Sequence, residues 1–486
     1  MQLICKLMAG FFVLASACTA QTPAPSNPLK TYIKEDAPVI VLNNVRLIDG
    51  TGAPVRERMR IDFDHGKIVN VQSAMLRNAF PPGAKVIDLE GKTVFPGMVG
   101  MHEHLYYATP LEPKDGVVFF GEAPDSAPRL YLAAGVTTAR TAGSVEPYAD
   151  IQLKKSIDAG ELPGPKLRFT APYLEGKPTL GPQLYELKDA ADAGRMVDYW
   201  ADEGATSFKA YMHITPDELK AAIDHAHAKG LKITGHLCSI GFTEAADMGI
   251  DNLEHGLVVD TEFFLEKKPG VCPGQRGPMM EMAKNLEIES APVQKMIQDL
   301  VARHVAVTST LAIFESFIGT RAPLEFEMEQ KQSMSGESWS HVLETRAGLA
   351  ERADKSPWGA LLKKEMEFER SFVKAGGMLM AGCDPTGFGG ILAGFGDQRE
   401  LELLVEAGFT PLEAIHIATE NGAKWLGEDA SEGTIAAGKA ADIVIIDGNP
   451  AEKISDVEKV ETVFKDGVGY DPVKLRASVQ GLAGIR

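Results

Sequence analysis

A pair of histidines follows one apolar run of this sequence. His102 and His104 come after residues 94–101, which have the sequence VFPGMVGM. Residues two apart on a β-strand point to the same face and lie about 7 Å apart, so two imidazoles at this spacing can bind one metal ion. The alternative is that the two histidines only close a buried strand. The pair therefore predicts a metal site if other ligands accompany it.

Three further residues of ligand type end other short apolar segments. His236 follows the sequence KITG, His255 follows DNLE and Asp384 follows MLMAGC. Imidazole and carboxylate groups are both common zinc ligands. One such residue at a strand end is usually structural or solvated, but five of them at four strand ends predict a shared metal centre.

Lys209 lies within the apolar segment ATSFKAY. A lysine that faces an apolar interior is unfavourable unless it is paired, and its ammonium has no lone pair for a metal. Carboxylation by carbon dioxide would convert it into a carbamate whose two oxygens can bridge two ions. The alternative is a lysine that reaches solvent or pairs with a carboxylate.

Two residues that follow Lys209 in the sequence are candidates for substrate binding. Tyr211 and His213 share the strand parity of Lys209 if the strand extends that far. His213 also precedes a helix start at Thr215, so capping or packing is the alternative for it. His225 and His227 do not form a second metal pair, because they lie in a helical pattern where residues two apart point roughly 200° apart.

Eight apolar, strand-like segments alternate with helical stretches. This alternation and number predict a (β/α)8 TIM barrel, an α/β fold whose chemistry lies at the carboxyl ends of its strands. The candidate ligands fall at those ends. The segments are 93–101, 137–142, 166–170, 207–212, 232–237, 252–255, 306–311 and 378–382.

The two ends of the chain have a different pattern, with short apolar segments between turn signals that predict antiparallel strands. The long stretches 262–300 and 314–364 are either lids over the site or surface decoration. The expected parts are a signal peptide at 1–20, a tether at 21–38, a small β-sandwich from 39–95 and 430–470, the barrel at 96–429 and a C-terminal extension at 471–486.

The composition is that of an ordinary globular protein, with 486 residues, 44% of them hydrophobic and 24% charged. The net charge of -18 is spread along the chain without a basic cluster. This pattern excludes a nucleic-acid surface and a polybasic membrane patch. We expect a small-molecule substrate and leave a homo-oligomer open.

Residues 1–20 have the pattern of a signal peptide. A cation precedes the apolar run 7–17, which is too short to span a bilayer and ends in small residues. The sequence LASAC resembles a bacterial lipobox with Cys18 as the lipidated residue, although its leucine stands one position early. The alternative is ordinary cleavage after Ala17 or Ala20. We expect export, to the periplasm or as an outer-membrane lipoprotein of a bacterium, with membrane contact only through the lipid anchor.

Three cysteines lie beyond the signal region, namely Cys238, Cys272 and Cys383. An odd and sparse set predicts no disulfide framework. Two of the three neighbour candidate ligands, but small buried thiols are the simpler interpretation. We assign no chemistry to them.

Together these motifs resemble the amidohydrolase superfamily of metal-dependent hydrolases. The resemblance covers nearly everything after the tether. Lys209 resembles the lysine of the branch with prolidase-like dipeptidases and N-acyl amino acid hydrolases, and argues against imidazolonepropionase-like members, which use one metal without it. The residues that carry the resemblance are 96–104 (PGMVGMHEH), 135–138 (GVTT), Lys209, His236, 254–256 (EHG), Asp384 and 438–442 (GKAAD).

The resemblance implies a (β/α)8 barrel with a β-sandwich from both chain ends, and a binuclear site. His102 and His104 would hold the more buried ion with Asp384, His236 and His255 would hold the exposed ion, and carboxylated Lys209 would bridge the two. Zinc is the expected metal, with manganese, iron or cobalt as alternatives.

The implied reaction is hydrolysis of an amide bond, in a dipeptide or an N-acyl amino acid, by a hydroxide that bridges the metals. Asp384 would act as general base and then as general acid. The alternatives on the same site are a lactonase, a phosphotriesterase or a cyclic amide hydrolase. A non-catalytic, lipid-anchored binding protein is a further alternative, which the presence of all six ligands disfavours.

Overall fold

The computed structural model describes residues 28–76, 78–110, 118–179, 181–321, 324–387 and 390–484. The expected signal peptide with Cys18, and the first part of the expected tether, lie outside the described residues. None of the described helices has the length and apolar composition needed to cross a membrane.

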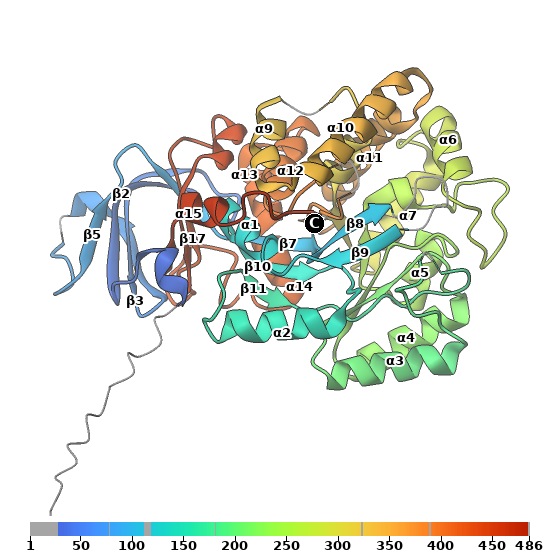
Figure 1. Cartoon of the computed structure of the whole chain (residues 1–486), viewed down its shortest axis with the longest axis horizontal. Helices are drawn as coiled ribbons and strands as arrows, with labels where there is room; N and C mark the ends of the chain where they lie inside the picture. Colours follow the sequence, from blue (N-terminus) through green and yellow to red (C-terminus); the bar gives the residue numbers. More distant parts are fainter. Residues whose placement is uncertain are drawn as a thin grey trace, which may run out of the picture.

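A nine-stranded sheet is assembled from both ends of the chain and lies at one end of the molecule (Figure 1). Its order is β1-β19-β18-β17-β6-β2-β3-β4, with β5 paired to β2. Buried side chains such as Ile61, Ile443 and Phe464 form its core. The strands are β1 (Ile33–Glu35), β2 (Val39–Leu47), β3 (Arg56–Asp64), β4 (Lys67–Ser73), β5 (Lys85–Asp88), β6 (Thr93–Pro96), β17 (Ile443–Ile446), β18 (Val460–Lys465) and β19 (Val468–Tyr470).

Eight parallel strands follow the predicted segments and form two sheets. The sheet orders are β11-β10-β7 and β12-β13-β14-β15-β16, and parallel bridges at Thr170 with Ser207 and Leu174 with Ala210 connect them. The strands are β7 (Met98–Glu103), β10 (Val136–Thr141), β11 (Lys166–Arg168), β12 (Ser207–Ala210), β13 (Lys232–Gly235), β14 (Asn252–Glu254), β15 (Ala306–Ser309) and β16 (Leu379–Ala381).

The α/β class is confirmed, whereas a closed ladder is not found among the described strands. Between β16 and β7, the contact is a hydrogen bond that the Asp384 N–H donates to the His102 carbonyl over 3.0 Å. A hairpin of β8 (Tyr106–Pro110) and β9 (Val118–Glu122) extends beyond β7.

Helices surround the parallel strands, with α2 to α5 on one side of the view and α9 to α12 on the other (Figure 1). The α-helices are α1 (Ala127–Ala134), α2 (Pro147–Asp158), α3 (Ala190–Asp202), α4 (Pro216–Ala228), α5 (Phe242–Met248), α6 (Arg276–Asn285), α7 (Ala291–Ala302), α8 (Leu311–Ser316), α9 (Leu324–Ser333), α10 (Gly336–Glu351), α11 (Trp358–Lys374), α12 (Phe395–Glu406), α13 (Pro411–His416), α14 (Gly422–Leu426) and α15 (Pro472–Ala477). Short helical turns include η1 (Pro28–Thr31) and η3 (Gly256–Val259).

Two details differ from the sequence-based expectation. The tether predicted for 21–38 is wrong from residue 28, because η1 and β1 are ordered there and β1 pairs with β19. The single strand predicted for 93–101 is two strands, since the chain passes from one sheet to the other at Gly97. A Cβ atom at Gly97 would lie 2.0 Å from Thr137 Oγ1, so this crossing requires glycine.

Candidate active site

All six predicted ligands line one cavity of about 270 Å³. His102 is in β7 and His104 follows it, while Lys209 is in β12. His236 and His255 come directly after β13 and β14, and Asp384 is the third residue after β16. Strand direction explains this convergence, because parallel strands bring their carboxyl ends to the same edge.

Asp384 is the centre of the ligand group. Its Oδ1 atom lies 3.1 Å from His104 Nε2 and 3.6 Å from His102 Nε2, and its Oδ2 atom lies 3.9 Å from His255 Nδ1. Ligand atoms of His102, His255 and Asp384 lie within 4.8 Å of one another. The ring centroids of His236 and His255 are 4.6 Å apart. These donors fit a divalent cation.

Burial keeps the imidazoles neutral, which leaves their lone pairs available to a cation. Desolvation and the positive charge of Lys209 lower the pKa of His102 to about 4 and that of His236 to about 3. Burial alone would raise the pKa of Asp384, but the surrounding histidines outweigh it and hold that pKa well below its usual range. Burial also lowers the pKa of Lys209 to about 8.

Two residues that the sequence reasoning did not assign hold His102 in place. The His102 Nδ1–H group donates to Glu254 Oε2 over 2.8 Å, and Arg140 Nη2 donates to Glu254 Oε1 over 2.7 Å. Both Glu254 and Arg140 are fully buried. A carboxylate on the second ring nitrogen fixes the orientation of a ligating histidine. The position of Glu254 directly before His255 was the only signal in the sequence.

The backbone at two predicted ligands adopts unusual conformations. His255 has φ 68° and Asp384 has φ 51°, in the left-handed region that side chains other than glycine seldom adopt. Near them, a Cβ atom at Gly382 would lie 2.3 Å from the His102 nitrogen, so β16 can approach β7 only with glycine there. Such conformations cluster at functional sites.

Two aromatic clusters form much of the cavity wall. The first contains Tyr106, Phe120, Tyr173 and Tyr211, where the Tyr106 and Tyr173 hydroxyls are 2.7 Å apart and the Tyr173 and Tyr211 rings are 4.6 Å apart. The second contains Phe314, Phe317 and Trp358, with centroid distances of 5.6 Å and 4.6 Å to the Trp358 ring. The second cluster comes from α8, the residue after it and the start of α11. No pocket contacts could be predicted for this stretch from the sequence.

Of the two predicted substrate contacts, Tyr211 lines the cavity and His213 is not among the described lining residues. The His213 Nδ1 atom lies 3.2 Å from Glu175 Oε1, and the His213 backbone N–H donates to the same oxygen over 2.8 Å. The alternative role at a helix start fits this position, since Thr215 caps α4 in a capping box with Glu218.

The other histidine pair lies on α4, as its helical pattern predicts. His225 faces Asp198 and His227 faces Asp251, each at 3.0 Å. The two rings therefore have separate partners. Residues two apart on a helix point roughly 200° apart, which explains this separation.

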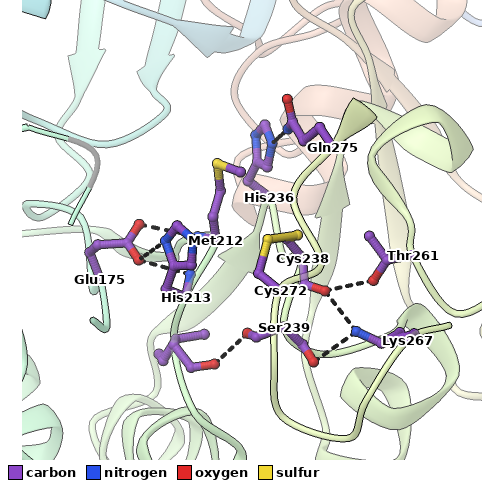
Figure 2. Close-up of a disulfide and its surroundings, with 11 residues drawn as sticks. Glu175, Met212, His213, His236, Cys238, Ser239, Thr261, Lys267, Cys272 and Gln275 are labelled. Carbon is purple, nitrogen blue, oxygen red and sulfur yellow. Dashed lines mark hydrogen bonds and ion pairs between the residues drawn. A yellow bond between two sulfur atoms is a disulfide. The ribbon is translucent and has the colours of Figure 1, made fainter. Parts of the chain in front are cut away.

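Cys238 and Cys272 form a disulfide with Cα atoms 4.9 Å apart (Figure 2). Our expectation that the cysteines form no disulfide is wrong. The two residues are 34 positions apart in the sequence and meet because the loop after η3 returns to the end of β13. Spacing along the chain contains no signal of this approach. Cys383 is free and buried.

Known proteins resemble this chain in sequence and in fold. Residues 360–469 match the model of the Amidohydrolase family. A dihydroorotase of Pelotomaculum thermopropionicum (strain DSM 13744 / JCM 10971 / SI) is 24% identical over 390 residues, which are 76% of this chain and 81% of that protein.

Solved structures share the fold at low identity. A structure from Bifidobacterium longum assigned as a prolidase has 22% identity and a TM-score of 0.66, and the alignment covers 90% of this chain and 95% of that one. An Xaa-Pro dipeptidase with bound methionine has 20% identity and a TM-score of 0.64, with 89% and 100% covered. Residues 360–469 therefore resemble part of an amidohydrolase domain, and the chain shares the fold of these prolidase and dipeptidase structures.

Proposed function

We propose that this protein is a binuclear metal-dependent hydrolase that cleaves the amide bond of a dipeptide or an N-acyl amino acid. The observation that supports this proposal best is the convergence of four histidines, Asp384 and Lys209 on one cavity. The four histidines and Asp384 match the donor types of a zinc centre. The pKa shifts at the site favour neutral imidazoles and an ionised carboxylate.

We also propose that the eight parallel strands make up a (β/α)8 barrel that closes between β16 and β7. The Asp384 to His102 hydrogen bond and the close approach at Gly382 support this closure. The sheet from both chain ends would then be the smaller domain, with bounds at 39–95 and 430–470, beside a barrel at 96–429. These bounds remain predictions.

Two divalent ions would provide a hydroxide near neutral pH and polarise the substrate carbonyl. In our proposal His102, His104 and Asp384 hold one ion and His236 and His255 hold the other. The lowered pKa of Lys209 gives a fraction of unprotonated amine near pH 8, and only that form can react with carbon dioxide to make the bridging carbamate.

Asp384 would move the proton. Its lowered pKa keeps it ionised in the resting enzyme, so it can accept the proton of the attacking water. It would then pass that proton to the leaving nitrogen, and thus act as general base and general acid in turn. The Tyr211 hydroxyl, whose pKa burial raises above its usual range, stays a neutral hydrogen-bond donor to the substrate.

The walls of the cavity favour a particular kind of substrate within this class. Aromatic side chains that surround a site bury apolar groups and contact other rings. Both aromatic clusters line the cavity together with Met212, Val259 and Ile313. We therefore propose an apolar or aromatic side chain next to the scissile amide.

A cyclic amide is the second candidate substrate, because the curated relatives are dihydroorotases. The same donor groups would serve in opening a cyclic amide, and the aromatic clusters would contact its ring. Lactone and phosphotriester substrates remain alternatives that the test below separates.

Metal analysis of the purified mature protein, followed by a hydrolysis screen, tests the proposal. The screen compares N-acyl amino acids and dipeptides with aromatic, aliphatic and charged side chains against cyclic amides, lactones and phosphotriesters. We expect two metal ions per chain and the highest kcat/KM on an apolar amide. Activity on esters or phosphotriesters alone would refute the amide assignment.

Asp384→Asn gives a mechanistic test in the same assay. With metal still bound, this change should lower kcat at least 10²-fold, since it removes the group that moves the proton. Near-normal turnover in a metal-loaded Asp384→Asn enzyme would contradict the role of Asp384.

We further propose that the protein is exported and anchored through Cys18. The disulfide supports this proposal, because such bonds persist mainly in oxidising compartments. Fractionation of a bacterial host checks the anchor: Cys18→Ser should move the protein from the membrane fraction to the soluble fraction. Unchanged membrane association would rule out lipidation at Cys18.

A further inference from the structure

The loop that precedes α6 returns to the end of β13, where predicted ligand His236 lies. We call residues 262–275 the strap loop. Thr261 Oγ1, just before it, donates to the Cys238 carbonyl over 2.6 Å. Lys267 Nζ donates to the Cys238 carbonyl over 2.7 Å and to the Ser239 carbonyl over 2.8 Å (Figure 2). These bonds hold the first half of the strap loop.

The second half depends on the disulfide. Within residues 268–274, all of which the structure describes, the bridge from Cys272 to Cys238 is the one side-chain link by hydrogen bond, ion pair or disulfide to another part of the chain. Cys238 is 1% exposed, two residues after His236, whereas much of this half of the loop is exposed. The cross-link therefore joins an exposed loop to the buried end of a strand.

Gln275 follows at the end of the strap loop, at the N-cap position of α6. Its side-chain amide lies 3.2 Å from His236 Nε2, and Gln275 lines the active-site cavity (Figure 2). If His236 binds a metal through Nδ1, its Nε2–H can donate to the amide oxygen of Gln275. An acceptor on the second ring nitrogen orients a histidine ligand, and the loss of such a partner typically lowers metal affinity or activity 10- to 100-fold.

We propose that Gln275 is a positioning residue for His236 and that the Cys238–Cys272 disulfide keeps it in place, so that metal affinity depends on the redox state of this cysteine pair. The inference rests on the proposed function for the role of His236. A phosphine reduces the S–S bond to two thiols. The phosphine supplies both electrons and becomes its oxide, and water supplies the oxygen atom and the two protons.

Zinc affinity of the full-length mature protein, measured by competition with a chromophoric chelator, tests the role of Gln275 without any substrate. Gln275→Ala should weaken zinc binding about 10-fold. Gln294→Ala is the matched control, because Gln294 on α7 is half-buried and hydrogen-bonded to the Ile288 carbonyl and to Ser371 on α11, away from the cavity. Equal zinc affinity in wild type and Gln275→Ala would overturn the inference.

The strap is tested by breaking the disulfide. Cys272→Ser, or treatment of the wild type with the phosphine, should weaken zinc binding as much as Gln275→Ala does. Because both changes act through one contact, the double variant Cys272→Ser with Gln275→Ala should show little further loss. Additive losses, or a reduced bridge with unchanged affinity, would refute the link between the disulfide and Gln275.

Hydrogen exchange separates this inference from the proposed function. Reduction should accelerate amide exchange in residues 268–275 of the wild type and leave the Cys272→Ser variant unchanged. If the protein binds no zinc in the oxidised or the reduced state, the proposed function is refuted. Faster exchange on reduction would still show that the disulfide holds the strap loop in place. Unchanged exchange after complete reduction would refute the strap whatever the protein binds.

Discussion

Lys209 is the residue on which the proposed number of bound metals depends. It is 1% exposed, and burial lowers its pKa to about 8. We predict that Lys209→Ala loses most bound metal and lowers kcat/KM at least 10²-fold, because the bridging group is gone. Elemental analysis and activity measure both effects, and a short carboxylate such as formate should restore part of each. Unchanged metal content in Lys209→Ala would show that this lysine forms no bridge.

At the same residue scale, ligands and their supports differ in how well they can be predicted. The shared cavity position of His102 and His104 could be predicted because strand period and spacing together place them on one face. The helical period separates His225 and His227. Glu254 and Arg140 could not, since their contact joins β14 to β10 and is visible only once those strands are placed. Gln275 depends on a loop that a disulfide folds back, which no local pattern indicates.

At the scale of elements, apolar runs made the parallel strands predictable, whereas residues 314–364 did not show their full helical content. The exposed side of that stretch is polar, so its overall composition resembles that of a loop. Nevertheless α9, α10 and the start of α11 lie within it. Trp358 is placed beside Phe314 by α11 packing on α8. The wall of the cavity therefore depends on tertiary packing and could not be predicted from the chain alone.

Helices α11 and α12 carry buried carboxylates that should make stability depend on pH. Burial raises the pKa of Glu365 to about 8 and that of Glu400 to about 7, and it raises the pKa of Glu369 well above its ordinary value. A raised pKa means that the folded state binds the proton more tightly than the unfolded state. The stability from these groups is therefore complete below about pH 4.5 and is lost as the pH rises through 7 to 8.

Glu369→Gln tests this effect, because a neutral amide of similar size removes one of these titrations. We predict that its melting temperature exceeds that of the wild type by about 2 °C at pH 8.5 and by less at pH 5. Calorimetry of both proteins across this range measures the difference. A constant difference between the two melting temperatures at all pH values would contradict a buried, titrating Glu369.

At the scale of the whole molecule, the two chain ends meet and both contact the catalytic strands. Strand β17 from the C-terminal end pairs with β6, and β6 leads through Gly97 into β7 with its histidine pair. The motif GKAAD at 438–442 belongs to this junction: Asp442 accepts hydrogen bonds from Lys166 of β11 and from the Asp466 backbone. The motif therefore has a structural role: the hydrogen bonds of Asp442 connect the nine-stranded sheet to the parallel strands.

Lys166 is the main cation of that junction. Its Nζ atom lies 2.7 Å from Asp442, 2.9 Å from Asp466 and 3.4 Å from Glu432, and its side chain is 18% exposed. Burial would lower its pKa, but the three carboxylates outweigh burial and raise it. Loss of this cation would leave buried Asp442 without its cationic partner and Glu432 with Arg168 at 3.7 Å, since the nine-stranded sheet and β11 both remain packed around them.

We therefore predict that Lys166→Ala lowers the free energy of unfolding by about 3 kcal/mol. Lys154→Ala, which removes an exposed pair with Asp158 within α2, should lower it by only about 0.3–0.5 kcal/mol. Denaturant titrations of both variants give the comparison, and zinc affinity should be unchanged in each because Lys166 does not line the cavity. If the two variants lost equal stability, the junction would depend on apolar packing alone, and the role assigned to the GKAAD motif would be wrong.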